Sequence, residues 1–271
     1  STVAAALVAA KLGVRVAHVE AGLRSGDWTM PEEINRVVTD RLSDALFTTE
    51  GAANENLAAE GVSEDRVHFV GNVMIDTLER HRERAAEMKV AEGMGLEPGG
   101  FLMVTLHRPS NVDDPGRLAA LLMALGEVVA GTGHQVLLPL HPRTAARVKE
   151  LELQKLLQPL TILPPLRYLD FLGLMQDAAA VVTDSGGIQE ETTVLGIPCI
   201  TVRPNTERPV TLTHGTNRLY HGDPHGLLDV VREELLSERS GVRPPLWDGH
   251  AAERIAMITL GLGTNGDSDP V

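Results

Sequence analysis

The chain has 271 residues, of which 43% are hydrophobic and only 3% are aromatic, so its core must consist mainly of aliphatic side chains. It carries 24 Lys and Arg against 37 Asp and Glu, a formal net charge of -13, which argues against a nucleic acid as partner. A single cysteine, Cys199, excludes an internal disulfide, and its apolar surroundings indicate a small core residue. No apolar run is long enough to cross a membrane, so we expect a cytoplasmic protein.

The first part of the chain, residues 1–70, has the pattern of an α/β domain. Ser1–Leu12 resembles a helix that is already under way, with no strand before it, so we expect the chain to begin within a domain. Short apolar runs then alternate with helical patterns, which is typical of a parallel sheet covered by helices. The predicted strands are Val14–Val19, Ala45–Thr48 and Val67–Val70, and the predicted helices are Pro31–Leu42 and Ala52–Glu60.

Residues 71–248 form a second predicted domain of the same α/β class. Gly71 marks the boundary, and a charged helix at Ile75–Lys89 connects the two domains. A helix over 249–260 is expected to pack back on the first domain, and residues 261–271 to be disordered. The predicted strands of this domain are Phe101–Leu106, Gln135–Leu140, Thr161–Leu163, Ala180–Thr183, Pro198–Val202 and Asn217–Tyr220, with a last helix at Pro224–Ser237.

The strongest candidate for a ligand site is the run VTDSGGIQEE, residues 182–191. A strand ends here, Gly186 and Gly187 allow a ligand to approach the backbone, and a helix begins, whose free N–H groups favour phosphate. Glu191, about one turn into that helix, is placed to accept hydrogen bonds from ribose hydroxyls. An ordinary strand-to-helix turn has the same pattern. The spacing is not that of a P-loop or of G-x-G-x-x-G, which argues against ATP hydrolysis and NAD binding.

Three further polar side chains follow predicted strands. Arg208, in TERP, is expected beside the same crevice, where a guanidinium suits a diphosphate, although a surface pair with Glu207 is the simpler interpretation. His107 and His141 each end a strand, and His107 is expected to point into a cleft between the domains. A histidine at such a position is more often structural than catalytic. The histidines show no H-E-x-x-H spacing, so we infer no metal ion and no cofactor.

Two glutamates of the first domain are candidates for acid and base. Glu20 ends a strand before a glycine loop, and Glu32 lies in the first turn of the next predicted helix. Arg36 is four residues beyond Glu32 and can share its helix face. A solvated, charged first turn explains Glu32 equally well, whereas two carboxylates at one cleft suit proton transfer.

These signals together match one family in order and spacing. The blocks HVEAGLRS, MPEEINR, TLHRPSNVDDP, TDSGGIQEE, LGIPCITVRPNTERP and HGTNRL closely resemble the non-hydrolysing bacterial and archaeal UDP-N-acetylglucosamine 2-epimerases. The resemblance runs from about Ser1 to Leu260. It implies two Rossmann-like, doubly wound domains facing a cleft, in a glycosyltransferase-B-like arrangement with the first domain incomplete. It also implies a homodimer and a role in cell-surface polysaccharide biosynthesis.

The resemblance further implies a reaction and its residues. UDP-N-acetylglucosamine would be converted to UDP-N-acetylmannosamine by elimination of UDP and its re-addition to a glycal intermediate. Glu20, Glu32 and His107 fall on the family's catalytic positions. The positions that would hold the UDP portion of the substrate are Leu166, Phe171, Ser185, Gly186, Gly187, Glu191 and Arg208.

Several alternatives stay open at this stage. The family implies an opening of about a hundred residues before Ser1, the size of a βαβαβ half, with a phosphate-side arginine and a third catalytic carboxylate. An inactive UDP-binding fragment is therefore one alternative. The others are a 2-epimerase of a UDP-2,3-diacetamido uronic acid sugar, a form that hydrolyses its substrate, and a glycosyltransferase of similar shape.

Overall fold

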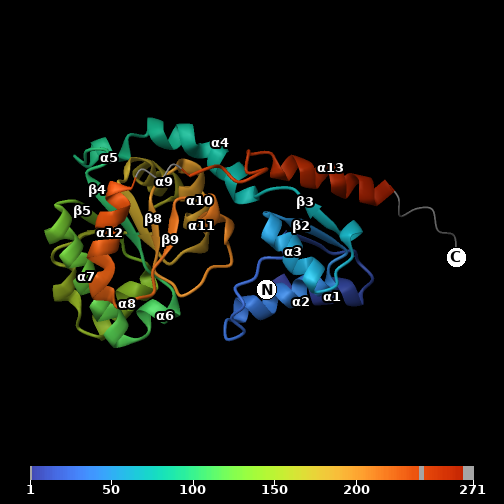
Figure 1. The fold of residues 1–271 in the computed structure, drawn as a ribbon, viewed down its shortest axis with the longest axis horizontal. Helices are drawn as coiled ribbons and strands as arrows, with labels where there is room; N and C mark the ends of the chain where they lie inside the picture. The colour runs from blue at the N-terminus through green and yellow to red at the C-terminus, as the bar shows by residue number, and fades with distance from the viewer. Residues whose placement is uncertain (1, 238–240, 265–271) are drawn as a thin grey trace. The chain divides into compact units, whose positions relative to one another are not determined.

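The computed structural model describes residues 2–237 and 241–264 and divides the chain into two compact units (Figure 1). The sequence-based boundary near Gly71 lies inside unit 1, and the change of unit falls within helix α4 (Val73–Glu87). Unit 1 comprises Ser1–Arg80, Glu207–Val210 and Arg243–Val271, and unit 2 comprises His81–Thr206 and Thr211–Val242.

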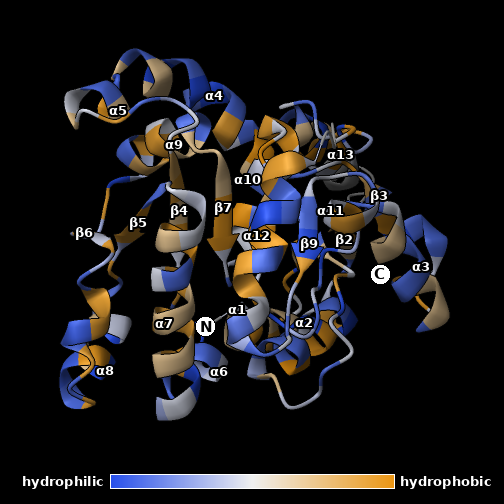
Figure 2. Ribbon diagram, turned by 60° about the vertical axis from the view of Figure 1, so that its left-hand side comes forward, coloured by the Kyte–Doolittle hydropathy of each residue, from blue (hydrophilic) through white to orange (hydrophobic). Residues whose placement is uncertain are grey.

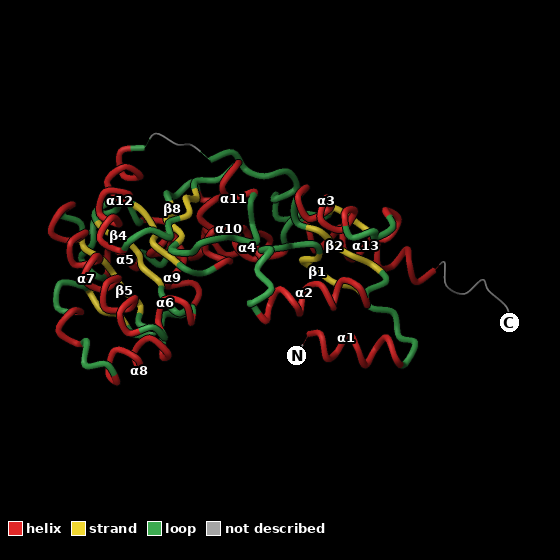
Figure 3. Tube along the Cα trace, turned by 60° about the horizontal axis from the view of Figure 1, so that its bottom comes forward, coloured by secondary structure: helices red, strands yellow, loops and turns green. Residues whose placement is uncertain are grey.

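Unit 1 contains a three-stranded parallel sheet in the order β1-β2-β3. Helices α1 and α2 lie side by side next to it (Figure 3). The predicted strand Val14–Val19 is wrong at both ends, because pairing with the neighbouring strand begins only where Ala17 lies opposite Ala45. The elements are β1 (Ala17–Ala21), β2 (Ala45–Thr48), β3 (Val67–Phe69), α1 (Thr2–Lys11), α2 (Pro31–Leu42), α3 (Gly51–Ala59), a 3-10 turn (Glu64–Arg66) and α13 (Ala251–Thr264).

The central strand of unit 1, β2, is buried on both faces. Leu46 packs with Leu57 of α3 on one face, while Phe47 packs on the other with Ile255 and Ile258 of α13. Alternate side chains of a strand point to opposite faces, so one strand contributes to both small cores. Helix α13 continues to Thr264, so the segment expected to be disordered starts as helix, and its remainder, 265–271, lies outside the described residues.

Unit 2 contains a six-stranded parallel sheet in the order β6-β5-β4-β7-β8-β9. In chain order this is 3-2-1-4-5-6, the doubly wound order, so the strand order reverses between β4 and β7. The α/β prediction is confirmed, and all predicted strands except the first match to within one residue at each end. The strands are β4 (Phe101–Thr105), β5 (Gln135–Pro139), β6 (Thr161–Leu163), β7 (Ala180–Thr183), β8 (Cys199–Thr201) and β9 (Asn217–Leu219).

Helices cover the sheet of unit 2, as Figure 2 shows around the hydrophobic strands β4 and β7. The remaining helices are α5 (Val90–Gly93), α6 (Pro109–Val112), α7 (Pro115–Thr132), α8 (Pro142–Glu150), α9 (Tyr168–Asp177), α10 (Gly186–Leu195), α11 (Val210–Thr213) and α12 (Leu227–Leu236), with 3-10 turns at Gln154–Leu157 and Pro224–Gly226.

The core of unit 2 is aliphatic, as its composition predicts. Leu118, Leu122 and Leu125 of α7 belong to the same hydrophobic cluster as Val104 of β4, and each fully buried leucine contributes roughly 1.5–3 kcal/mol. Cys199 is completely buried, and this burial raises the pKa of its thiol to about 11. The prediction of a core cysteine is therefore confirmed. In the described part of the chain, no helix combines the length and the hydrophobicity needed to span a membrane.

Candidate active site

The ends of β4 and β7 form the best-organised polar cluster of unit 2. These adjacent strands are linked where they end by a 2.6 Å hydrogen bond between the hydroxyls of Thr105 and Thr183. Asp184 follows β7 directly, and His107 follows β4. Ligands of doubly wound sheets bind where the strand order reverses, so the fold itself points to this position.

Asp184 holds the loop that carries His107. Its fully buried carboxylate accepts hydrogen bonds from the amides of His107 (3.0 Å) and Arg108 (2.9 Å) and from the Asn111 side chain (3.2 Å). Burial alone would raise the pKa of Asp184, but the hydrogen bond and charge of His107, with the other donors, hold this pKa below its usual value. The carboxylate thus fixes the backbone after β4.

Asp184 also fixes the side chain of His107. The Nδ1 atom of His107 lies 3.0 Å from a carboxylate oxygen of Asp184, and the ring leans on that of His141 at a centroid distance of 5.5 Å. Because Nδ1 is engaged by Asp184, Nε2 is the ring nitrogen that could contact a ligand, and 38% of the side chain is exposed. His107, which the sequence left as a weak candidate, is therefore a held and accessible group.

Helix α10 begins beside this cluster, with Ser185 at its N-cap and Gly186 and Gly187 in its first turn. The Ser185 amide donates to the Thr183 hydroxyl (3.0 Å), and the side chain of Gln189 donates to the Ser185 carbonyl (3.1 Å). The first amides of a helix have no partner within it, and together with the helix dipole they attract anions. The predicted phosphate position therefore lies at the start of an ordinary helix that is held in place on both sides.

Glu191 is the second acidic group of this region, and its contacts differ from those of Asp184. It is 4% exposed, and its carboxylate accepts a 2.9 Å hydrogen bond from the hydroxyl of Tyr168, the first residue of α9. Burial raises the pKa of Glu191, which the bond from Tyr168 only partly offsets. Leu166 and Phe171, on either side of Tyr168 in the sequence, are both half-buried. The start of α9 thus lies next to α10.

Glu20, in unit 1, has an unusual backbone conformation. Its φ of 67° lies in the left-handed region, and the pairing of β1 with β2 is interrupted there, between Val19 and Ala21. A non-glycine residue in this region costs of order 1 kcal/mol and is typical of functional sites. The bulge redirects the side chain of Glu20 at the end of its strand. Gly22 then turns the chain, at a point where a Cβ would lie 2.5 Å from the carbonyl oxygen of Ala53.

A buried aspartate of α2 stabilises the loop after Glu20. Asp40 accepts hydrogen bonds from Gly22 N (3.0 Å) and His18 Nδ1 (2.5 Å) and forms an ion pair with Arg24 at 2.7 Å. Burial raises its pKa, yet His18 and Arg24 together lower that pKa below its usual value. Arg24 is held from its other side by Glu60, at 2.7 Å.

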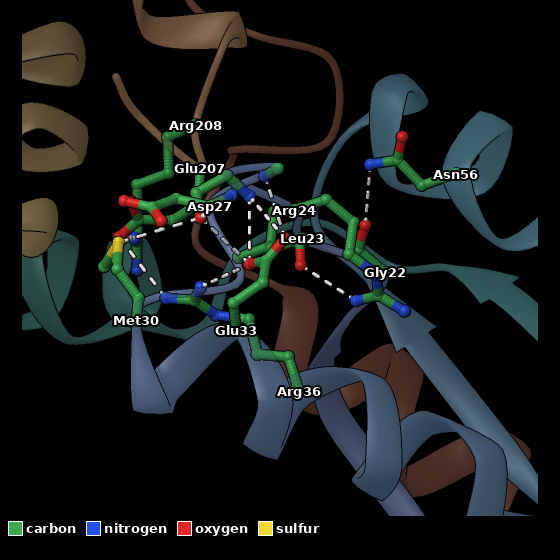
Figure 4. A network of polar contacts seen from close by, with 12 residues as sticks. Gly22, Leu23, Arg24, Asp27, Met30, Glu33, Arg36, Asn56, Glu207 and Arg208 are labelled. Atoms are coloured by element: carbon green, nitrogen blue, oxygen red, sulfur yellow. Dashed lines mark hydrogen bonds and ion pairs between the residues drawn. The ribbon is translucent and has the colours of Figure 1, made fainter. Parts of the chain in front are cut away.

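Arg208 lies in unit 1, in a polar network that includes Glu207 and Arg36 (Figure 4). The buried carboxylate of Glu207 pairs with Arg208 at 2.5 Å and with Arg36 at 3.5 Å. The other guanidinium nitrogen of Arg208 lies 3.8 Å from a carboxylate oxygen of Glu20. These contacts of Arg208 in unit 1 form a chain of alternating charges that ends at Glu20.

The neighbouring acids Glu32 and Glu33 at the start of α2 have opposite surroundings. Glu33 is 2% exposed and accepts hydrogen bonds from the amides of Ser25 (3.0 Å) and Gly26 (2.9 Å). Glu32 is exposed. Arg36, which the sequence placed on the helix face of Glu32, pairs with Glu33 at 3.1 Å, because Glu33 lies on the helix face that carries the loop.

The structure thus groups the predicted site residues into two sets, one in each unit. Glu20 and Arg208 lie 3.8 Å apart in unit 1. His107 and Ser185 follow the ends of the adjacent strands β4 and β7 in unit 2. Sequence reasoning missed Asp184 as the partner of His107, although an acid directly after a buried strand is a usable signal. It had no signal for Asp40 or Tyr168, whose partners are remote in the chain. The pair of Glu207 with Arg208 that the sequence suggested is present, but Glu207 is buried and not at the surface. Among the residues described, no three metal-ligating side chains gather.

Known proteins resemble this chain along most of its length. The family model described as UDP-N-acetylglucosamine 2-epimerase matches residues 1–260. The UDP-N-acetylglucosamine 2-epimerase of Methanococcus maripaludis is 38% identical over 267 residues, which cover 96% of this chain and 73% of the relative. The UDP-2,3-diacetamido-2,3-dideoxy-D-glucuronate 2-epimerase of Pseudomonas aeruginosa is 39% identical over 259 residues, 94% of this chain and 71% of the relative.

A solved structure has the same fold. The UDP-GlcNAc 2-epimerase of Methanocaldococcus jannaschii, crystallised in complex with UDP-GlcNAc and UDP, superposes with a TM-score of 0.89 at 39% sequence identity. The match covers 96% of this chain and 73% of that structure.

Proposed function

Because this chain belongs to the UDP-N-acetylglucosamine 2-epimerase family, we propose that it converts UDP-N-acetylglucosamine to UDP-N-acetylmannosamine. The observation that carries the proposal is the cluster at the reversal of strand order in unit 2. There the first turn of α10 offers amides to a diphosphate, while Asp184 holds His107 beside it. A UDP-sugar has the charge and the ribose hydroxyls that this cluster, with Glu191, would recognise.

The chemistry requires a good leaving group, because the C2 proton of the sugar is not next to a ketone. A base removes this proton, its electron pair forms the C1–C2 double bond, and the bond between C1 and the diphosphate oxygen breaks. UDP leaves with that electron pair, and the glycal remains. A proton then adds to C2 from the opposite face and UDP re-adds at C1, so atoms and charge balance over the cycle.

Each cluster has a role in this sequence. Negative charge develops on the departing diphosphate, and the α10 amides and His107 stabilise it. The carboxylates of Glu20 and Glu32 carry the proton transfers at C2, with the assignment of base and acid between them open. Arg208 is 3.8 Å from Glu20 and supplies positive charge next to that carboxylate.

Deuterium incorporation tests the reaction. The full-length protein is incubated with UDP-N-acetylglucosamine in heavy water and followed by proton NMR. We expect deuterium at C2 and a product of manno configuration. UDP binding without exchange at C2 would overturn UDP-N-acetylglucosamine as the substrate and favour a different UDP-sugar or a glycosyltransferase.

A second substrate has an observation in its favour. The relative from Pseudomonas aeruginosa, whose name specifies a diacetamido uronate sugar, is as similar to this chain as the relatives named for UDP-N-acetylglucosamine. The two substrates differ at C3 and C6 of the sugar and share the UDP portion. Parallel turnover measurements with both, at equal concentrations, decide between them: the substrate with the higher kcat/KM is the one used.

A homodimer in the cytoplasm completes the proposal. The support for both is the family membership. Light scattering coupled to size-exclusion chromatography measures the assembly directly, and a monomeric mass at micromolar concentration would contradict the dimer.

A further inference from the structure

The hydroxyl of Tyr168 is the polar partner of Glu191 in the described part of the chain. The Oη atom donates to Oε1 of Glu191 at 2.9 Å, across the space between the start of α9 and the second turn of α10. Tyr168 and Glu191 are 23 positions apart, so this contact exists only in the folded chain.

The tyrosine ring is itself held in place. Its edge meets the ring of His81 at a centroid distance of 6.2 Å and an angle of 76°, a favourable T-shaped geometry. Burial and the adjacent carboxylate both raise the pKa of Tyr168, so the hydroxyl keeps its proton and acts as the donor. Glu191 therefore receives a hydrogen bond from a group that neither ionises nor rotates freely at neutral pH.

This contact has a consequence for the orientation of the carboxylate. Glu191 is 4% exposed, so water does little to solvate its charge, and one oriented hydrogen bond has a large influence on which way it points. With Oε1 bound to Tyr168, Oε2 is the oxygen that remains for a ligand. A single carboxylate oxygen in a fixed position can accept from the two neighbouring hydroxyls of a ribose.

We propose that Tyr168 is a positioning residue for nucleoside recognition: it orients Glu191 so that the site selects a ribonucleotide over its 2′-deoxy analogue. This rests on the proposed function, in which Glu191 faces the ribose of UDP. Tyr168 itself need not touch the ligand. Its effect appears only with a ligand that carries the 2′-hydroxyl.

The test compares UDP with 2′-deoxy-UDP by isothermal titration calorimetry, for the full-length protein and its Tyr168→Phe variant. We expect the wild-type protein to bind UDP at least about tenfold more tightly than 2′-deoxy-UDP, because a hydrogen bond to a charged group is at stake. Tyr168→Phe should weaken UDP binding about tenfold and change 2′-deoxy-UDP binding less than about twofold, so the preference disappears.

The control is Tyr220→Phe. Tyr220 is the only other tyrosine of the chain, and its hydroxyl donates to the backbone carbonyl of Asp223, away from Glu191. This variant should keep the full preference for UDP. A double variant, Glu191→Gln with Tyr168→Phe, should bind UDP no more weakly than Glu191→Gln alone, because the tyrosine acts through the carboxylate.

The possible outcomes distinguish the role of Tyr168 from the proposed binding of UDP. A wild-type protein that fails to bind UDP overturns the proposed function and the inference with it. A wild-type protein that binds both nucleotides equally shows that Glu191 does not read the 2′-hydroxyl. Equal losses for both nucleotides in Tyr168→Phe, with the wild-type preference intact, overturn the inference alone and leave Tyr168 a packing residue.

Discussion

The Nδ1 atom of His107 lies 3.0 Å from the carboxylate of Asp184, which is completely buried at the end of the neighbouring strand. Because Asp184 also accepts the backbone amides of His107 and Arg108, it fixes both the loop and the ring. Asp184 is therefore the group on which the position of His107 depends.

Asp184→Asn should lower kcat by about 10- to 100-fold while KM changes less than about threefold, because the ring loses its orientation but the α10 amides remain. Turnover by proton NMR measures both constants. Asn111→Ala is the control, since it removes another donor to Asp184 without touching His107. It should lower the melting temperature and leave kcat within about threefold. A wild-type kcat in Asp184→Asn would contradict the prediction.

Two substitutions of Glu20 distinguish the effect of its strained backbone from the role of its carboxylate. Glu20→Gly should raise the stability by about 1 kcal/mol, because glycine adopts the φ of 67° without strain, and should abolish turnover. Glu20→Gln should abolish turnover with an unchanged melting temperature, since the strain stays. Thermal unfolding followed by circular dichroism compares the two variants. If glycine is no more stable than glutamine at this position, the left-handed conformation is not strained.

The adjacent acids of α2 provide a matched pair. Glu32→Gln should reduce turnover at least about 100-fold, while UDP binding and the melting temperature stay close to wild type, because the side chain is exposed. Glu33→Gln should instead lower the stability by about 1–3 kcal/mol. The reason is that one of the two buried oxygens that accept from the Ser25 and Gly26 amides is replaced by an NH2 group, which donates. Equal losses of turnover and UDP affinity in Glu32→Gln would remove it from the chemistry.

Glu191 should show a conflict between stability and binding. Its pKa is raised in the folded chain, so the folded state holds the proton more tightly than the unfolded state. The free energy of unfolding therefore falls as pH rises through the pKa that Glu191 has in the folded chain. Below its pKa in the unfolded chain, Glu191 has no such destabilising effect. Glu191→Gln should raise the stability at pH 7 by about 1 kcal/mol and weaken UDP binding at least about tenfold. A melting temperature below wild type would contradict the sign.

Asp40 and Asp184 should have the opposite dependence on pH. Their pKa values are lowered in the folded chain, so each contributes stability above its unfolded value that is lost as pH falls through the folded one. The melting temperature should fall below about pH 4. Asp40→Asn should lower the melting temperature at pH 7 and make it less dependent on pH below 4, whereas the exposed Asp229→Asn should follow the wild-type curve. An unchanged slope in Asp40→Asn would place the acid sensitivity elsewhere.

The sequence by itself determined the class of fold and most of its strands, because alternation of short apolar runs with helical patterns is a local property. It also determined where a strand-to-helix turn follows β7, since Gly186 and Gly187 at such a junction are recognisable without the fold. The family followed from the order of six motifs. Each of these depends on residues that are neighbours in the chain.

Only the tertiary structure decided which side chains are hydrogen-bond partners. Tyr168 meets Glu191 across 23 positions and His107 meets Asp184 across 77. Local sequence can mark Asp184 as an acid after a buried strand, but it identifies the partner in neither pair. The same holds for the choice between Glu32 and Glu33, which depended on the loop that covers one face of α2. The physical reason is that burial and hydrogen-bond partners, which set charge and orientation, arise when distant segments pack together.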